Sequence, residues 1–205
     1  MFTADLLDHL EDTLCIDTTR IYATGKSNGG GFVNYLACHP ISARFAAFAP
    51  VAGAFYEGFG ANGPACQPAR SPQPILEIHG YNDSQISYFG DPSHHGGALP
   101  KITDWASDWA IRNGCSDGEG PSATPEVDGK VIYYSYPCDT YHYAVYGADH
   151  VWESTIGNAD TERYEYGPSP INATSKIIDF FNKIQLPSNL ARNLQSAQPS
   201  SFRDL

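Results

Sequence analysis

The chain has 205 residues and a formal net charge of −11, and its length suits one domain that buries a sizeable core. The excess of acidic groups argues against nucleic acid or an anionic membrane surface as a partner, because both would repel it. With 41% hydrophobic and 17% charged residues, and no apolar run of about 18 residues, neither a disordered nor a membrane-spanning chain is predicted.

Strand-like and helix-like segments alternate along the chain. The predicted order is helix 3–14, strand 20–24, helix 30–37, strand 45–51, loop 52–73, strand 74–79, helix 99–113, strands 131–136 and 141–146, and a last helix from about residue 172. Alternation with short turns predicts an α/β fold, a mostly parallel sheet with helices on both faces. Residues 188–205, which are polar and lack periodicity, are expected to be a flexible tail after a single domain over 1–187.

The first and last helices are predicted to be amphipathic. The first is expected to begin with Thr3 as its N-cap and to carry an apolar stripe. The stripe comprises Leu6, Leu7, Leu10 and Leu14. In the last helix the apolar face is expected to comprise Ile177, Ile178, Phe180, Phe181 and Ile184.

The segment Gly25-Lys26-Ser27-Asn28-Gly29 carries the strongest functional signal. A predicted strand precedes it and a predicted helix follows it, which is the context of a nucleophile elbow. Such a turn exposes a serine hydroxyl at the end of a strand. The alternative for Ser27 is a tight turn in which the serine caps the helix.

A nucleophilic serine needs a histidine to take its proton and a carboxylate to orient that histidine. In the strand–turn–helix arrangement of such hydrolases, both follow the serine in the chain, on turns after later strands. Asp83 lies four residues beyond the strand 74–79, and His150 lies four residues beyond the strand 141–146. We therefore predict a Ser27, Asp83 and His150 triad, with the backbone N–H of Asn28 as one oxyanion donor.

Other acidic and histidine residues are weaker candidates for these roles. Asp91 suits a turn, Asp139 lies between strands, and Asp149 is too close to His150 in sequence to orient it. His79 ends a strand and is expected to support the acid turn by hydrogen bonding. The remaining histidines are expected to be structural, and none of them predicts a metal site; they are His9, His39, His94, His95 and His142.

Only 26 residues precede Ser27, and they contain one predicted helix and one predicted strand. The second oxyanion donor normally comes from a loop after an earlier strand of the sheet. We therefore expect the early strands and that loop to lie in a segment upstream of this sequence.

The five cysteines fit disulfides better than a metal site, because no two of them lie within four residues of each other. An odd number leaves one without a partner, which again suggests an upstream segment. Low lysine content, an acidic balance and a glycosylation sequon at Asn172-Ala173-Thr174 favour a secreted protein. Residues Met1–Asp5 lack the basic and apolar regions of a signal peptide.

Several motifs together resemble those of secreted α/β-hydrolase esterases, of the polyhydroxybutyrate-depolymerase and carbohydrate-esterase type. The similarity is greatest to fungal feruloyl esterases of the type C and D group and covers roughly residues 5–185. The motifs are Arg20–Gly31 around the elbow; Ile78-His79-Gly80-x-x-Asp83 with Ile86 and Tyr88; Trp109–Cys115 with Cys138; and Tyr146–Trp152.

The resemblance implies an α/β-hydrolase fold whose triad is Ser27, Asp83 and His150. It also implies hydrolysis of ferulic acid esters on plant cell-wall arabinoxylan, without a cofactor, and a disulfide between Cys115 and Cys138. The pairing of Cys15, Cys38 and Cys66 stays open. An aromatic acyl group would need an apolar slot, for which Tyr81, Tyr88 and Trp152 are candidates.

Two other interpretations stay open at the level of sequence. The same chemistry could act on acetyl groups of xylan or on a polyester such as polyhydroxybutyrate. Alternatively, the chain could be a non-catalytic secreted protein, or an inactive fragment, on an esterase scaffold. Asn82-Asp83-Ser84 is also a sequon, but a glycan there would obstruct the predicted acid, so modification is expected at Asn172 only.

Overall fold

The structure is a computed structural model that describes residues 2–58, 66–116, 118–163 and 167–188. Its centre is a six-stranded sheet with the order β1-β2-β3-β6-β5-β4. The strands are β1 (Tyr22–Lys26), β2 (Ala47–Val51), β3 (Ile75–Gly80), β4 (Ser122–Glu126), β5 (Val131–Tyr136) and β6 (Thr140–Val145). Strands β1, β2, β3 and β6 run parallel to one another, whereas β5 pairs antiparallel with both β6 and β4 at one side of the sheet.

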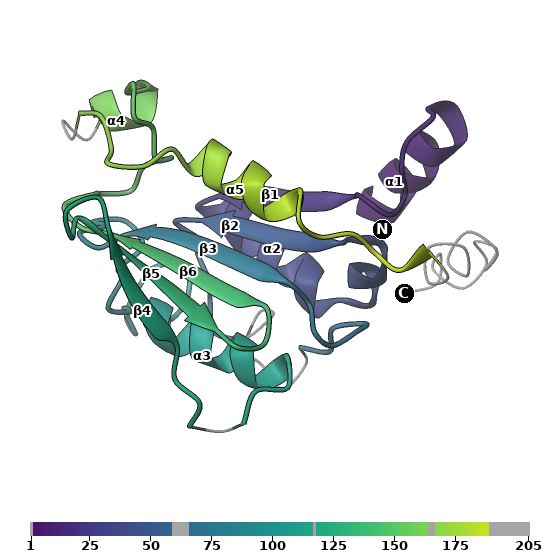
Figure 1. Cartoon of the computed structure of the whole chain (residues 1–205), viewed down its shortest axis with the longest axis horizontal. Coiled ribbons are helices and arrows are strands. Elements are labelled where there is room, and N and C mark those ends of the chain that lie inside the picture. Colours follow the sequence, from purple (N-terminus) through teal and green to yellow (C-terminus); the bar gives the residue numbers. More distant parts are fainter. Residues whose placement is uncertain (1, 59–65, 117, 164–166, 189–205) are drawn as a thin grey trace.

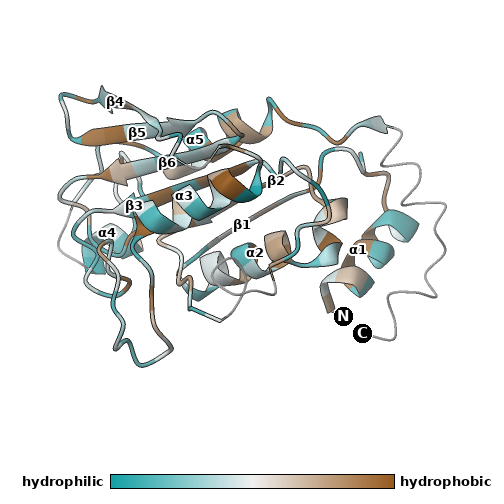
Figure 2. Cartoon of the chain, turned by 90° about the horizontal axis from the view of Figure 1, so that it is seen from below, coloured by the Kyte–Doolittle hydropathy of each residue, from teal (hydrophilic) through white to brown (hydrophobic). Residues whose placement is uncertain are grey.

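Helices cover both faces of this sheet (Figures 1 and 2). The helices are α1 (Phe2–Thr13), α2 (Asn28–Cys38), the short 3-10 helix η1 (Pro40–Arg44), α3 (Ile102–Arg112), α4 (Ala159–Arg163) and α5 (Ala173–Phe181). Helices α2 and α3 pack on one face and α5 packs on the other. This confirms the predicted α/β layering. None of the helices in the described ranges has the length and apolar character needed to cross a membrane.

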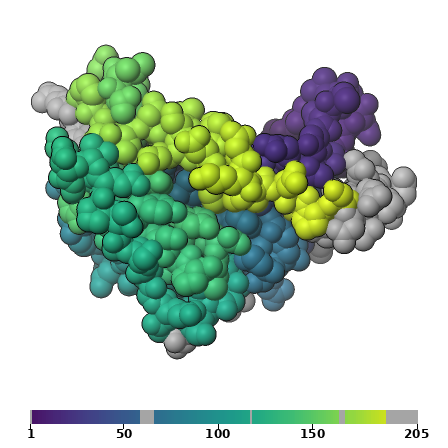
Figure 3. All heavy atoms as spheres, in the orientation of Figure 1, coloured from purple at the N-terminus to yellow at the C-terminus, as the bar shows by residue number. Residues whose placement is uncertain are grey.

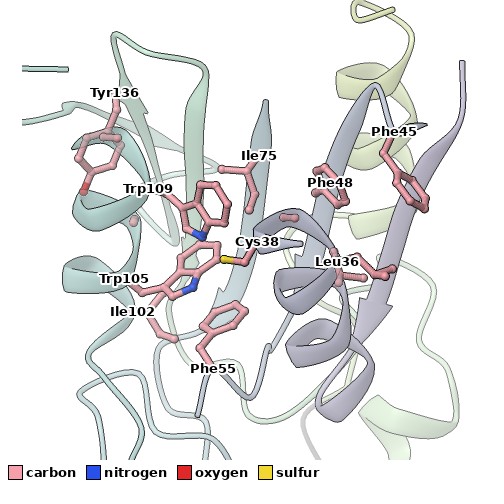
Figure 4. Packing of buried hydrophobic residues seen from close by; sticks show 14 of the residues in the cluster. Leu36, Cys38, Phe45, Phe48, Phe55, Ile75, Ile102, Trp105, Trp109 and Tyr136 are labelled. Atoms are coloured by element: carbon pink, nitrogen blue, oxygen red, sulfur yellow. The ribbon is translucent and has the colours of Figure 1, made fainter. Parts of the chain in front are cut away.

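The core on the α2 and α3 face is rich in aromatic side chains (Figure 4). Trp105 stacks on Phe55 with 4.0 Å between ring centroids. The indole N–H groups of Trp105 and Trp109 both donate to Asn34 Oδ1, at 3.2 and 3.0 Å. One buried amide on α2 therefore satisfies two indoles on α3, so that no polar atom of this trio is left without a hydrogen bond in the core.

Helix α2 lies against the sheet at very close range, and glycines permit that approach. A Cβ atom added at Gly31 would lie 2.3 Å from the Ala54 carbonyl oxygen, and one at Gly30 would lie 2.8 Å from the Gly53 Cα atom. The run of glycines after Ser27 therefore sets the distance between α2 and the loop that follows β2.

Three elements of the structure were absent from the sequence-based prediction: the 3-10 helix η1, strand β4 and helix α4. Strand β4 is exposed along its length and contains Pro125, so it lacks the apolar alternation that identifies a strand; it exists through its pairing with β5. Helix α4 has only five residues. Helix α3 begins at Ile102 rather than at residue 99, because Leu99 forms an isolated bridge with Asp91 and Pro100 follows it.

The predicted apolar faces of the terminal helices are only partly right. In α1, Leu7 is buried, Leu10 is half-buried and Leu6 is exposed; Leu14, which is also exposed, lies just after the helix. The helix protrudes at one corner of the molecule (Figure 3), so only one side of it meets the core. Helix α1 also begins at Phe2, so Thr3 lies inside it and is not its cap.

In α5, Ile177 and Phe181 are buried, but Ile178 is 51% exposed and is not part of the apolar face. The predicted start of this helix is correct, because Asn172 is its N-cap. The predicted tail over 188–205 lies outside the described residues except for Ser188.

Candidate active site

Ser27 lies at a sharp turn between the end of β1 and the start of α2. Its backbone has φ 59° and ψ −122°, a conformation that a residue with a side chain rarely adopts. The backbone N–H of Ser27 donates to the Val51 carbonyl oxygen at 3.0 Å, and a Cβ at Gly25 would lie 2.8 Å from the Gly29 carbonyl carbon. The turn therefore depends on its neighbouring glycine and on β2, as a nucleophile elbow does.

The hydroxyl of Ser27 makes no capping hydrogen bond to α2, although the residue occupies the N-cap position. The alternative interpretation of Ser27 as a helix-capping residue therefore finds no support in the geometry.

Asp83 and His150 meet at the same edge of the sheet. The His150 Nδ1–H donates to Asp83 Oδ2 at 2.9 Å, and both side chains are largely buried. Asp83 Oδ1 accepts the backbone N–H groups of Gln85 at 2.8 Å and Ile86 at 2.7 Å. With its carboxylate oriented from both sides, Asp83 can fix the tautomer and the ring plane of His150.

Hydrogen bonds keep Asp83 ionised despite its burial. Burial by itself would raise the pKa of this carboxyl, but the hydrogen bonds from His150 and His79 outweigh it and hold the pKa well below its usual range. Asp83 is therefore a carboxylate at neutral pH, as an orienting group beside a histidine base has to be.

The two loops that carry Asp83 and His150 are bonded directly to each other. The backbone N–H of Asn82 donates to the Ala148 carbonyl oxygen at 3.0 Å. Asp149 Oδ1 accepts both the backbone N–H and the hydroxyl of Ser84, each at 2.8 Å. A Cβ at Gly80 would lie 2.4 Å from the Asp149 carbonyl oxygen. Asp149 thus joins the loops and does not brace the imidazole.

The elbow is tied to the loop of His150 through an ion pair. Lys26 Nζ, one residue before Ser27, lies 2.6 Å from Asp160 Oδ2. The same carboxylate oxygen accepts the backbone N–H of Trp152 at 3.0 Å.

Because β1, β3 and β6 run in one direction, Ser27, Asp83 and His150 all follow carboxyl ends of strands at one edge. Strand β1 lies two strand spacings, about 10 Å, from β3.

The aromatic residues proposed for substrate contact have different surroundings. Tyr88 is buried, and its hydroxyl lies 3.0 Å from His142 Nε2, so its ring belongs to the core rather than to an open surface. The indole N–H of Trp152 donates to Thr174 Oγ1 at 3.0 Å. Tyr81 is half-buried and packs against Phe89 and Tyr146 at centroid distances of 4.9 and 4.4 Å.

The other acidic and histidine candidates have structural partners. Asp91 Oδ1 accepts hydrogen bonds from Ser93, and Asp139 Oδ1 accepts one from Tyr141. His39 Nδ1 accepts the backbone N–H of Ile41 at 3.2 Å. His9 lies exposed on α1, and the rings of His94 and His95 pack against each other.

Two buried carboxyl groups near Asp83, those of Glu77 and Glu153, make contacts that the sequence analysis did not predict. Glu77 lies between His79 and His142, and its side chain has no exposed surface. Glu153 is buried beside Ser169. An acidic residue in an otherwise apolar strand, as Glu77 is, was the one available signal, because a buried carboxylate requires partners.

A cavity of about 670 Å³ lies between α3 and the loop after β3. Its lining residues include Glu57, Phe89, Asp91, Lys101 and Asp104. Ser27, Asp83 and His150 do not line it.

Among the described residues, a group with metal-ligand spacing comprises Cys115, Glu119 and Cys138, but its two sulfur atoms are joined in a disulfide and offer no thiolate.

Two disulfides are present. Cys115 pairs with Cys138, and Cys38 pairs with Cys66, which resolves the pairing that the sequence left open. Cys15 is an exposed free cysteine.

Comparison with curated proteins relates the chain to fungal esterases. It is 36% identical over 128 residues to feruloyl esterase B of Piromyces equi, a match that covers 60% of this chain and 23% of that protein. It is 37% identical over 147 residues to a bifunctional acetylxylan esterase/xylanase of Neocallimastix patriciarum, covering 67% of this chain and 18% of that protein. A probable feruloyl esterase C of Aspergillus flavus is 32% identical over 131 residues, covering 61% and 42%.

These matches confirm the resemblance to feruloyl and carbohydrate esterases. The chain spans less than a quarter of the length of the first two relatives. No protein-family model matches it.

A solved structure supports the fold. The acetyl xylan esterase from Aspergillus awamori superposes with a TM-score of 0.54 at 13% identity, covering 80% of this chain and 65% of that one. At this identity the likeness concerns the fold alone, and it confirms an α/β-hydrolase-like arrangement of sheet and helices.

Proposed function

We propose that this chain, as a relative of fungal feruloyl and acetylxylan esterases, hydrolyses carboxylic esters of plant cell-wall polysaccharide with Ser27, His150 and Asp83. The observation that carries this proposal is the 2.9 Å contact between His150 Nδ1 and Asp83 Oδ2. This contact lies at the same sheet edge as Ser27, which directly follows β1 and has the backbone conformation of a nucleophile elbow.

The reaction would proceed in two acyl-transfer steps. Ser27 Oγ attacks the ester carbonyl carbon while His150 Nε2 takes the hydroxyl proton, and the alcohol leaves with that proton. Water then attacks the acyl-serine by the same route in reverse and releases the acid. Asp83 remains ionised throughout and stabilises the imidazolium that forms in each step. The chemistry needs no cofactor.

The developing oxyanion would be held by the backbone N–H of Asn28, the first residue of α2. The N–H groups of a helix's first turn have no partner within the helix and point toward its N-terminus. A second donor is not identified among the described residues. An oxyanion donor typically contributes about 10²- to 10³-fold in rate, so a site with the Asn28 donor alone would be slower by about this factor than a site with two donors.

Feruloyl esters are the proposed substrates, as hydroxycinnamoyl groups on arabinoxylan. Tyr81, Phe89 and Tyr146 form an aromatic cluster on the loops after β3 and β6. Phe89 is 56% exposed and Tyr146 is 38% exposed. Exposed rings at this edge suit a planar aromatic acyl group better than an acetyl group.

The acyl preference can be tested directly by comparing methyl ferulate, acetylated xylan and a short polyester at equal ester concentration. We expect the highest kcat/KM with methyl ferulate. A higher value with acetylated xylan would replace the feruloyl assignment with an acetylxylan esterase, and hydrolysis of the polyester alone would indicate a depolymerase.

The catalytic assignment is tested by a serine-directed fluorophosphonate and by single substitutions. The probe should label Ser27, and Ser27→Ala and His150→Ala should each lower kcat by at least about 10⁴-fold. Ser107→Ala on α3 is the matched control and should change kcat less than twofold. Absence of labelling in folded protein would favour the non-catalytic interpretation.

We further propose that residues 1–187 form one hydrolase domain and that the protein acts outside the cell. Two disulfides among the described residues fit an oxidising compartment. Asn172, half-buried at the start of α5, is the proposed glycosylation site.

A further inference from the structure

A chain of buried polar side chains runs through the centre of the sheet to Asp83. Glu77 and His142 are cross-strand neighbours on β3 and β6. His142 Nδ1 lies 2.6 Å from Glu77 Oε2, and His79 Nδ1 lies 2.8 Å from Glu77 Oε1. These three side chains are at most 1% exposed. A buried carboxylate flanked by two imidazoles is stable only if protons are distributed to satisfy all of them.

The partners of His142 assign the proton at its end of this chain. Its Nε2 faces the Tyr88 hydroxyl at 3.0 Å, and a phenol donates readily to an imidazole nitrogen. His142 Nδ1 then carries the ring proton, 2.6 Å from Glu77 Oε2. The contact does not have hydrogen-bond geometry, but an N–H group at this distance favours the ionised form of Glu77.

The partners of His79 are oxygen acceptors on both sides. Its Nε2 lies 2.8 Å from the Ile86 carbonyl oxygen and 3.3 Å from Asp83 Oδ2. A carbonyl oxygen can only accept, so Nε2 carries a proton. Its Nδ1 faces Glu77 Oε1, which also accepts when Glu77 is ionised. Both nitrogens of His79 are therefore donors.

We propose that His79 is a positioning residue: a permanently protonated, buried imidazolium that holds the Asp83 carboxylate ionised and aimed at His150. This inference rests on the proposed function for the role of Asp83, but the protonation state of His79 stands independently of it. The Glu77 carboxylate balances the charge.

The charged groups around His79 support this state. Burial alone would lower the pKa of His79, but Glu77 and Asp83 outweigh it and raise the pKa to about 10. The pKa of Glu77 is lowered, because His79 and His142 together outweigh its burial. The rings of Tyr88 and His79 are nearly perpendicular, with 6.0 Å between their centroids. Among the described residues, Glu153, from the segment after β6, also interacts with the charge of His79.

The geometry also explains what the imidazolium does to the acid loop. Through Nε2 it joins the end of β3 to the carbonyl of Ile86, whose own N–H donates to Asp83 Oδ1. Asp83 Oδ2 is then shared between His79 and His150. A neutral residue at position 79 would remove both the positive charge and one of the restraints on the loop.

The first test is long-range ¹H–¹⁵N correlation NMR on the full chain labelled with ¹⁵N-histidine, between pH 5 and 9. His79 should show two protonated ring nitrogens throughout this range. His39 is the internal control, because its Nδ1 accepts the backbone N–H of Ile41, so that nitrogen should give the signal of an unprotonated ring nitrogen. A single protonated nitrogen on His79 at pH 7 would overturn the proposal. Backbone triple-resonance spectra assign the signals without a variant.

Two substitutions extend this test. In Glu77→Gln the counter-charge is gone, so His79 should lose a ring proton within the measured pH range; an unchanged spectrum would refute the role of Glu77. His79→Gln keeps a neutral donor but removes the charge. It should lower kcat about 10- to 100-fold with KM within about twofold, and should move the acid limb of the pH profile to higher pH, because the site loses a nearby positive charge.

A purely structural role for His79 predicts a different result. Activity would then fall equally at every pH, with no shift of the acid limb. The NMR measurement does not require ester hydrolysis, so a chain without esterase activity that still shows the imidazolium would refute the proposed function and leave the protonation state of His79 intact.

Discussion

Glu153 is a second buried carboxyl near the candidate site, with a different protonation state. It is 1% exposed, and its Oε2 accepts a hydrogen bond from the Ser169 hydroxyl. Burial raises the pKa of Glu153 to about 7, and the Ser169 hydrogen bond offsets this only in part. In contrast to Asp83, Glu153 lacks a close imidazole donor, which is why two neighbouring carboxyls differ so much.

This pKa gives stability a predictable dependence on pH. A carboxyl with a folded-state pKa near 7, above its unfolded value of about 4.3, binds more protons in the folded state. The stability that this bound proton adds to the folded state is fully present below about pH 4.3 and is lost as the pH rises to about 7. We expect Glu153→Gln, which stays neutral, to lose less stability over this window, by up to about 1.4 kcal/mol per pH unit.

Urea unfolding of both proteins at half-unit steps from pH 4.5 to 8 measures this difference. The free energies of unfolding should diverge as the pH rises, since all other titrating groups are common to both. A gap that stays constant across the series would show that Glu153 titrates near its ordinary pKa.

At the level of single residues, position after a strand was an informative signal. It led to Asp83 and His150, which the structure brings into contact, and to His79 as a support for the acid turn, where it lies 3.3 Å from Asp83. The contact between Glu77 and His142 could not be predicted, because the two residues lie on different strands. Such contacts depend on the register between β3 and β6.

At the level of elements, helix α5 has an N-terminus set by one side chain. Asn172 Oδ1 accepts the backbone N–H of Ser175 at 2.9 Å, which satisfies one of the free donors of the first turn. The same residue is the acceptor of the proposed glycan. Capping and glycosylation use different atoms of the amide, so the two roles can be separated.

Two substitutions at position 172 separate them. In enzymatically deglycosylated protein, Asn172→Ala should lower the free energy of unfolding by about 1 kcal/mol. Asn172→Asp keeps a capping oxygen and should lower the free energy of unfolding by only a few tenths of a kcal/mol. From a secreting host, both variants should lack the mass of one glycan. Equal destabilisation by Ala and Asp would show that the cap contributes nothing.

Long periodic elements were predictable and short ones were not. Strand β2 has a continuous apolar run and is buried along its length, and in helix α5 burial follows the predicted apolar face at Ile177 and Phe181, although not at Ile178. Strand β4 has no such pattern and depends on β5 through a tight turn in which Val127 and Asp128 take positive φ values. The sequence of one segment cannot identify a strand that forms only because it pairs with a neighbouring strand, as β4 does with β5.

At the scale of the whole molecule, two disulfides restrain the segments between the strands. Cys38–Cys66 links the end of α2 to the segment before β3 and spans 28 residues; Cys115–Cys138 encloses the β4 and β5 hairpin and spans 23 residues. Closing loops of this length stabilises a folded chain by about 3 to 4 kcal/mol each, chiefly by limiting the unfolded state.

Removing each pair separately tests this contribution. Cys38→Ser/Cys66→Ser and Cys115→Ser/Cys138→Ser should each lower the free energy of unfolding by about 3 kcal/mol and lower the melting temperature. Cys15→Ser, at an exposed free cysteine, is the matched control and should leave both unchanged. A double variant as stable as the control would mean that its disulfide does not constrain the unfolded chain.

The global layering was predictable because alternating strands and helices leave few arrangements of a parallel sheet. The antiparallel side of the sheet was predictable only in part: the short connection between β5 and β6 allows a hairpin but no crossover, whereas β4, which has no apolar pattern, left the edge of the sheet unspecified. The open pairing of Cys38 with Cys66 likewise required distances that only the folded chain supplies.

The contact at Gly80, where the backbone of one loop rests against that of the other, has a dynamic consequence. The acid and the histidine sit on segments that cannot separate without breaking the same hydrogen bonds, so they should open as one cooperative unit. Amide hydrogen exchange at Asn82 and Ser84 should therefore slow or quicken together, and a fluctuation that releases the base would release its carboxylate partner in the same event.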